Sequence, residues 1–219
     1  MNFSKIDIIN LALGHLGRDP VNDLTTEGPQ IALVANMYDV LKGKCLEDSD
    51  WIFATKAVRL SMLANPSDFP GYKYTFALPT NPNPLNPSEK RLSVRSIQTE
   101  KNGNVQQATA NKDYKLTADT VYTNEDVPTF CIYIFDQIES RFSYSFVIYF
   151  SLAIAAMAAI PITQSQQKKE ELLKEAEVAK SVAIQNDKIQ SPPTIIQNDF
   201  TNTRYGRFIG TPTQFNSDF

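Results

Sequence analysis

The sequence predicts an α+β fold: a four-helix-type bundle with an inserted small antiparallel β-sheet and an extended C-terminal tail. Three observations lead to this prediction. Apolar residues recur at helical spacing over 1–57 and again over 137–190, the two parts of the expected bundle. Over 58–136, the expected β-rich insert, the apolar spacing is closer to two. Residues 191–219 are so polar that they cannot bury enough surface to fold alone.

The first expected helix starts after Ser4, whose hydroxyl can cap it in a capping box with Asp7. Four apolar residues then share one helical face: Ile9, Ala12, Leu13 and Leu16. Gly17 stands where a left-handed C-cap is needed, and Pro20 prevents the helix from resuming. The segment therefore predicts a short amphipathic helix followed at once by a tethered loop.

A second helix is expected from about Pro29 to Leu46, because proline suits the first helical position. Its apolar residues recur at helical spacing: Ile31, Val34, Ala35, Tyr38, Leu41 and Cys45. Trp51 and Phe53 follow directly after this helix. A tryptophan beside a phenylalanine at such a position is typical of a core anchor, which is the role we predict for Trp51.

The stretch 58–136 predicts one small antiparallel sheet of about four to six strands. A half-buried strand is expected from Tyr72 to Leu78, ending at Pro79. Other strands are expected at three places: Leu92–Ile97, the hairpin Tyr114–Tyr122 and the central strand Phe130–Phe135. Two segments read as a loop and a turn: the proline-rich Asn81–Pro87 and Asn102-Gly103-Asn104.

Helical spacing returns after Asp136. The run Phe142–Ile160 is the most hydrophobic part of the chain and is expected to end at Pro161. A charged helix should then extend from Gln164 to about Asp187. Its narrow apolar seam consists of Leu172, Ala176, Ala179 and Ala183. The simplest packing places the two N-terminal helices against these two C-terminal ones.

The run Phe142–Ile160 is also long enough to cross a bilayer, which needs about 20 apolar residues. It contains serines and many alanines, and no cluster of basic residues lies close to either end. A central helix that its neighbours bury on all sides has the same composition. We therefore expect a bundle helix, with membrane association through this helix as the alternative.

Composition limits the classes of function. With 219 residues, of which 42% are hydrophobic and 21% charged, the chain is typical of a soluble globular protein. A net charge of −3 gives no global basic field for nucleic acid. Cys45 and Cys131 are expected to be buried free thiols, and the single histidine, His15, excludes a histidine-rich metal site. The N-terminus lacks the features of a signal peptide, so we expect a protein of the reducing cytoplasm.

No residue pattern predicts catalysis. His15 has no serine, cysteine or aspartate partner in view, so we interpret it as structural. Carboxylates occur as scattered pairs that we interpret as surface charges: Glu47 and Asp48, Glu125 and Asp126, Glu170 and Glu171. The sequence has no Walker, Rossmann, zinc or nucleophile-elbow pattern. We therefore predict no catalytic residue, cofactor or metal, although any two carboxylates could still meet in space as a hydrolase pair.

The tail interleaves basic and aromatic residues. We predict that five of its residues bind a partner: Arg204, Tyr205, Arg207, Phe208 and Phe215. Two arginines are weak support for nucleic-acid binding, and a segment that orders on a protein partner fits the pattern better. A disordered end without a partner is the alternative.

Taken in order, these features resemble the tail adaptor family of short-tailed bacteriophages, the head-to-tail connector proteins often called tail tubular protein A. The resemblance begins with Asn10, Ala12, Leu13, Leu16, Gly17, Pro20, Val21 and Leu24. It continues with three groups: Trp51, Phe53 and Ala54; Tyr72, Tyr74, Leu78 and Pro79; Asp113, Tyr114, Val121, Tyr122 and Thr123. An alanine-rich helix followed by a charged helix completes it, over about residues 3–190. The proline-rich loop after Pro79 and the tail after Ile189 depart from the family pattern.

The resemblance implies a structural virion protein and not an enzyme. It implies a homo-oligomeric ring of twelve copies, assembled in the host cytoplasm, that binds the portal protein on one side and the tail nozzle protein on the other. Such a ring continues the channel through which double-stranded DNA leaves the capsid, without specific DNA binding and without a membrane. A tail-associated cell-wall hydrolase is the alternative in the same setting.

Overall fold

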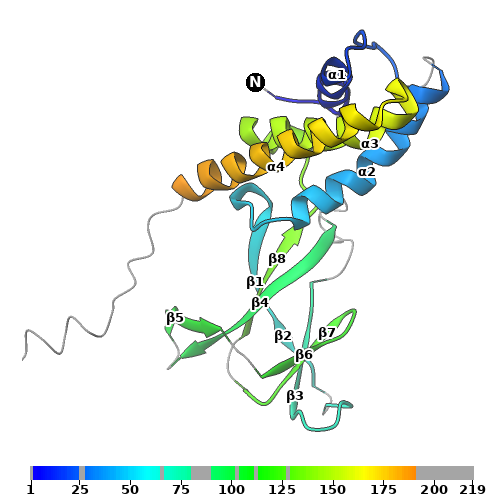
Figure 1. The fold of residues 1–219 in the computed structure, drawn as a ribbon. Coiled ribbons are helices and arrows are strands. Elements are labelled where there is room, and N and C mark those ends of the chain that lie inside the picture. The colour runs from blue at the N-terminus through cyan, green and yellow to red at the C-terminus, as the bar shows by residue number, and fades with distance from the viewer. Residues whose placement is uncertain are drawn as a thin grey trace, which may run out of the picture.

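The computed structural model describes residues 2–24, 28–64, 67–79, 90–101, 104–110, 113–126 and 129–190. Within them the fold is α+β, as predicted: four α-helices form one end of the molecule and two small antiparallel sheets form the other (Figure 1). Three predicted features lie outside the described residues: the proline-rich loop, the first two residues of the Asn102-Gly103-Asn104 turn, and the tail 191–219.

The first helix, α1 (Lys5–His15), has the predicted caps. The Asp7 backbone N–H donates to the Ser4 hydroxyl, and the Ser4 N–H donates to the Asp7 carboxylate at 2.9 Å, which closes the capping box. After the helix, Gly17 adopts a φ of +69°, the left-handed conformation expected there. The four apolar residues predicted to share one face are all buried: Ile9, Ala12, Leu13 and Leu16.

The second helix, α2 (Pro29–Glu47), also matches its prediction. Trp51 follows it and is completely buried, which confirms the predicted anchor. Its indole N–H donates to the Cys45 carbonyl at 2.9 Å, and its ring centroid lies 5.1 Å from that of Phe146. A short 3-10 turn, η1 (Ile52–Ala54), then leads into the first strand.

The helix α3 (Tyr144–Thr163) lies at the centre of the helical end. The helices α1, α2 and α4 (Gln166–Ile189) each pack against it. Among the described residues, α3 is the one helix long and apolar enough to cross a membrane, and 67% of that apolar segment is buried. This burial by neighbouring helices is typical of a core helix, the interpretation that the sequence favours.

The predicted end of α3 at Pro161 is wrong. The helix continues to Thr163, and Gln164 at its C-cap adopts a φ of +56°. A proline in the last turn removes one backbone N–H and therefore only one hydrogen bond, which is a small loss at the exposed side of a helix end. A side chain from another element satisfies a carbonyl beyond it, because the Arg18 guanidinium donates to the Ile162 carbonyl at 2.9 Å.

The last helix, α4, buries the predicted seam against α3. Leu172, Ala176 and Ala183 of the seam are buried, and Ala179 is half-buried. Asp187, in the last turn, is buried as well and accepts a hydrogen bond from the Ile52 backbone N–H at 2.9 Å. The end of α4 is thereby fastened to the turn that precedes the sheets.

The strands form two four-stranded sheets. One has the order β1 (Thr55–Arg59), β8 (Thr129–Phe135), β4 (Arg91–Lys101), β5 (Asn104–Ala110). The other has the order β2 (Ser61–Met62), β3 (Tyr74–Ala77), β7 (Thr120–Thr123), β6 (Tyr114–Leu116). The central place of β8 and the β6–β7 hairpin are confirmed. The prediction of a single sheet is wrong, because a period of two identifies strands but not which strands pair.

Leu60 marks the point where the chain passes from the first sheet to the second. Its N–H donates to the Thr129 carbonyl at 2.8 Å, and its side chain is buried in a core between the sheets. That core consists of Leu60, Phe76, Leu78, Ile97, Val121, Cys131 and Tyr133. Ile134 of β8 belongs instead to the core of the helical end, so β8 contributes side chains to both cores.

Candidate interaction surfaces

The residues that the sequence analysis selected for partner binding are not placed by the structure. All five lie outside the described residues: Arg204, Tyr205, Arg207, Phe208 and Phe215. The remaining candidates are the polar clusters, the cavities and the exposed apolar faces of the described part.

His15 lies at the end of α1, with its Nε2 atom 3.3 Å from the Ser151 hydroxyl of α3. Burial between the two packed helices lowers its pKa and so favours the neutral ring. This is the structural role that the sequence predicts for it. The three carboxylate pairs belong to different elements. Glu47 and Asp48 lie at the end of α2, Glu125 and Asp126 after β7, and Glu170 and Glu171 near the start of α4. No group of three potential metal ligands occurs among the described residues.

A partly buried ion-pair network joins α2 to the segment between β8 and α3. The Lys42 ammonium lies 2.8 Å from the Asp136 carboxylate and 3.2 Å from that of Glu139. The Tyr38 hydroxyl donates to Glu139 at 3.3 Å, and burial raises the pKa of Tyr38. Every charged group in this network has an opposite partner, so we interpret it as a structural joint between the helical end and the sheets.

A second polar cluster lines a cavity of about 240 Å³ between α2, α3 and α4. The Tyr149 hydroxyl donates to the Asp48 carboxylate, and the Lys180 ammonium lies 3.3 Å from the same carboxylate. Burial raises the pKa of the adjacent Cys45 thiol to about 11, so the thiol is neutral and a poor nucleophile at neutral pH. The cluster cross-links three helices.

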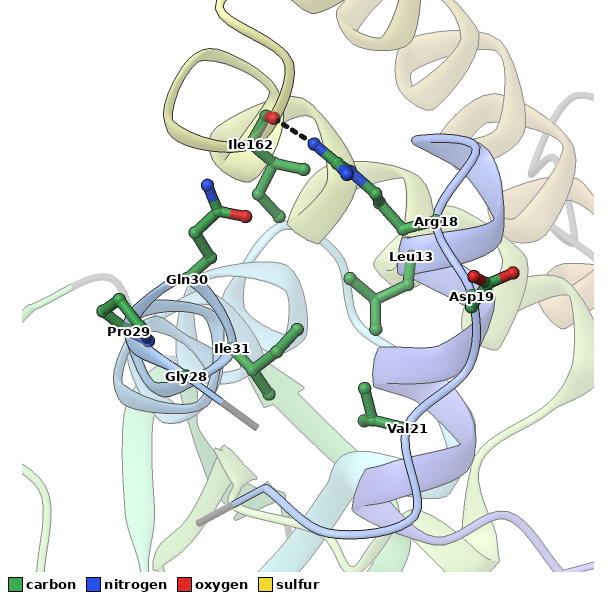
Figure 2. Close-up of a pocket in the computed structure, with 9 residues that line it drawn as sticks. All are labelled: Leu13, Arg18, Asp19, Val21, Gly28, Pro29, Gln30, Ile31 and Ile162. Carbon is green, nitrogen blue, oxygen red and sulfur yellow. Dashed lines mark hydrogen bonds between the residues drawn. The ribbon is translucent and has the colours of Figure 1, made fainter. Parts of the chain in front are cut away.

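A larger cavity, of about 430 Å³, lies between the loop after α1, the start of α2 and the end of α3 (Figure 2). Its loop is tied back to α1, because the Asn10 amide donates to the Val21 carbonyl at 3.0 Å and accepts from the Val21 N–H at 2.8 Å. Leu13 gives the cavity part of its apolar lining, and Arg18 reaches across to the Ile162 carbonyl. The tethered loop predicted from the sequence therefore holds α1 and α3 together.

All four helices expose apolar side chains, and those outside α2 and α4 are Leu11 of α1 and Tyr144, Ile148, Met157 and Ile160 of α3. On α2, the side chains of Val40 and Leu33 are 75% and 38% exposed. On α4, four large apolar residues outside the buried seam are exposed: Leu173 at 43%, Val178 at 66%, Val182 at 48% and Ile189 at 79%. Neither face has a partner among the described residues, and apolar faces of this kind commonly mark contacts with other proteins. The sequence analysis did not select them, although apolar residues outside the seam of a charged helix were a visible signal.

No family model matches this chain, and no curated protein matches its sequence.

Proposed function

We propose that this chain is a structural virion protein of a short-tailed bacteriophage, a subunit of the ring adaptor that joins the portal to the tail nozzle. The sequence resemblance supplies this identity. The observation that supports it best in the structure is the pair of exposed apolar helix faces on α2 and α4. Exposed apolar side chains can serve as contacts with other subunits, and a ring subunit needs one contact face for each neighbour.

The residues that carry the resemblance have structural positions, which agrees with an adaptor. Leu13 and Trp51 are buried in the core of the helical end, and Val121 is buried between the sheets. Asn10 holds the loop at Val21. These residues therefore specify the fold, and the adaptor function would depend on other residues at the surface.

The shape of the chain suits a connector with two different partners. In this proposal the helices pack around α3 as a four-helix-type bundle, and the sheets extend away from the helices (Figure 1). The two ends have separate cores joined through β8, so one end can contact the portal while the other contacts the nozzle. The net charge of −3 is compatible with DNA passing through the ring without being gripped.

Native mass spectrometry and electron microscopy of the purified protein, alone and mixed with the portal of the same phage, test the proposal. We expect closed rings that match the portal in symmetry and bind it end to end. Protein that stays monomeric in both conditions and never co-purifies with the portal would rule the adaptor function out.

A further inference from the structure

We infer that a groove between α2 and α4 binds residues 204–208 from the C-terminal segment of a neighbouring copy of this chain. Arg204 pairs with Asp187 at one end of the groove, and Phe208 enters an apolar hollow at the other end. The inference rests on the proposed function, because a contact between copies requires that the chain assembles. It names the surface that receives the segment selected from the sequence.

The groove exists because α2 and α4 both pack on α3 and scarcely contact each other. Two hollows lie between them, of about 340 Å³ and about 240 Å³, and Asp48 lines both. On α4 the hollows follow one line, since Ile184 and Asp187 line the first and Glu177 and Lys180 line the second. Small-molecule sites measure about 300–1,000 Å³, so hollows of this size suit single side chains.

We call the 340 Å³ hollow the acidic hollow, because a buried carboxylate without a cation lines it. Asp187 is only 6% exposed, and the N–H of Ile52 donates to one of its two oxygens, Oδ2, at 2.9 Å. Asp187 forms no ion pair among the described residues, and burial raises its pKa. A guanidinium beside it would neutralise the charge and add hydrogen bonds to the carboxylate.

The other charged groups around the acidic hollow leave this carboxylate to select the occupant. Asp50 is paired with Arg95 at 2.7 Å, and Asp48 is paired with Lys180 at 3.3 Å. Lys188 also lines the hollow, but it is exposed, where water and salt screen its charge. The hollow therefore suits a basic side chain better than an acidic or apolar one.

We call the 240 Å³ cavity the apolar hollow, after the uncovered apolar side chains that line it. Met157 of α3 and Leu173 of α4 are 45% and 43% exposed there. Leu41 of α2 and Ala176 of α4 also line the hollow and are buried. An aromatic ring between Met157 and Leu173 would cover this apolar surface, and a methionine sulfur makes favourable contacts with aromatic rings.

Residues 204–208 carry a basic and an aromatic side chain in the matching order. Alternate residues of an extended chain point to the same side. Arg204, Gly206 and Phe208 therefore share one side of the segment, and Tyr205 and Arg207 lie on the other. Gly206 has no side chain, so the backbone between the two anchors can lie close to the groove.

The distance between the two anchors fits the distance between the hollows. From Asp187, in the acidic hollow, to Glu177, in the apolar hollow, α4 rises about 15 Å. From Arg204 to Phe208 an extended chain advances about 13 Å. Because Asp187 lies in the last turn of α4, the segment must run antiparallel to this helix.

The position and length of the C-terminal segment favour a groove on another copy. The helix α4 ends at Ile189, at the edge of the helical end (Figure 1), and Pro192 and Pro193 follow shortly after. Consecutive prolines cannot continue a helix and favour an extended chain, which leads away from α4. From Gln190 to Arg204 an extended chain spans up to about 46 Å, more than the roughly 36 Å of α4 itself. The segment is therefore long enough to reach the groove of the next subunit.

Cysteine cross-linking in the full-length chain tests the contact. Phe208→Cys is mixed with Leu173→Cys, its expected neighbour, and separately with Val40→Cys, a control position that is 75% exposed and lines neither hollow. On mild oxidation under conditions of assembly, we expect covalent dimers with Leu173→Cys and few with Val40→Cys. The native Cys45 lines the apolar hollow but is buried, and burial raises its pKa to about 11, so Phe208→Cys alone should show little background.

Charge variants test the pairing of Arg204 with Asp187. Arg204→Ser should lower the yield of the expected cross-link about tenfold, the effect of losing one charge-assisted hydrogen bond. Arg207→Ser, the matched control on the other side of the segment, should leave the yield unchanged. Asp187→Asn, which keeps an acceptor for its backbone donor, should lower the yield as much as Arg204→Ser. The two changes combined should lower it no further.

The outcomes separate this inference from the proposed function. Rings that form without the cross-link, or equal losses for Arg204→Ser and Arg207→Ser, would overturn the inference while the adaptor function would stand. A chain carrying both Phe208→Cys and Leu173→Cys that cross-links only within itself would overturn the contact between copies. Monomers that never bind the portal would remove both the inference and the adaptor function.

Discussion

Asp187 shows how one buried side chain fixes the position of two distant segments. Its carboxylate accepts a hydrogen bond from the Ile52 N–H, which joins the last turn of α4 to the turn before β1. Burial raises the pKa of Asp187, and the hydrogen bond from Ile52 only partly opposes this effect. The carboxylate therefore stabilises the fold as a hydrogen-bond acceptor, but its charged form loses hydration free energy on burial.

Replacing Asp187 separates the acceptor from the charge. Asp187→Asn keeps an oxygen for Ile52 and should be at least as stable as the parent near neutral pH. Asp187→Ala, which removes the acceptor, should be less stable than the asparagine variant by about 1 kcal/mol in urea unfolding. Equal stability of the alanine and asparagine variants would mean that the hydrogen bond contributes nothing.

The same residue predicts a pH dependence. Because the pKa of Asp187 is higher in the folded protein than its ordinary 3.8, the folded state holds this proton more tightly than the unfolded chain. The resulting stabilisation is complete below about pH 4 and is lost as the pH rises through the folded pKa. The stability of the parent relative to Asp187→Asn should therefore increase on acidification, and a constant difference across the pH range would contradict this.

Single residues were predictable where their partners are close in sequence. Ser4 and Asp7 form their capping box within one turn, and Trp51 meets the Cys45 carbonyl six residues back. Asp187 could not be predicted in the same way, because its partner Ile52 lies 135 residues away. Nothing local distinguishes it from the surface charges of a solvated helix.

At the scale of elements, the start and stop of α1 follow from its own sequence. Gly14 lies within the helix and Gly17 lies just after it, and a Cβ added at either would meet no atom within 4 Å. The two positions differ in backbone conformation alone, since Gly17 has a φ of +69°. They form a matched pair for testing what ends the helix.

Alanine at these two glycines should have opposite effects. Gly14→Ala should stabilise the protein by about 0.5–1 kcal/mol, because glycine is a poor residue inside a helix. Gly17→Ala should destabilise it by about 1 kcal/mol, because an L-residue is strained at positive φ. Chemical denaturation of both variants checks the signs, and stabilisation by Gly17→Ala would show that the left-handed C-cap is not needed.

Helices were more predictable than strand pairing. Periodicity and caps located all four helices. The wrong end of α3, at Pro161, depends on support from other elements such as Arg18. The predicted start of the last helix at Gln164 is also wrong, because Gln164 is the left-handed C-cap of α3 and α4 begins at Gln166. Strand pairing is set by contacts far apart in sequence, for example Thr55 of β1 opposite Ile134 of β8. The exposed faces of α2 and α4 were missed for a related reason: only the packing on α3 reveals which apolar residues remain uncovered.

At the scale of the whole molecule, Lys42 helps to join the helical end to the sheets. Lys42→Met should keep the packing of the aliphatic stem and leave Asp136 and Glu139 without their cation. We expect a loss of about 2 kcal/mol, less than for a fully buried pair because both carboxylates are partly exposed. Lys42→Arg, which keeps the charge, should lose less. Equal losses in thermal or urea unfolding would mean that size, and not charge, matters at this position.

The C-terminal segment 191–219 should matter for assembly and not for folding, because its sequence is too polar to bury much surface. A chain ending at Gln190 should unfold at the temperature of the full chain but form rings or portal complexes less well. The matched control is the full-length chain with serine at Arg204, Tyr205, Arg207, Phe208 and Phe215, which separates these side chains from the length of the segment. A lower unfolding temperature of the truncated monomer would contradict the prediction.

The central position of α3 has a consequence for synthesis on the ribosome. The apolar faces of α1 and α2 are covered largely by α3, whose first residue, Tyr144, is translated about a hundred residues after the end of α2. For much of its translation, the emerging chain therefore exposes the apolar faces of two helices that α3 will later cover. Chains with exposed apolar surface are prone to aggregate. We expect chaperones to protect the N-terminal helices until α3 leaves the exit tunnel and packs against them.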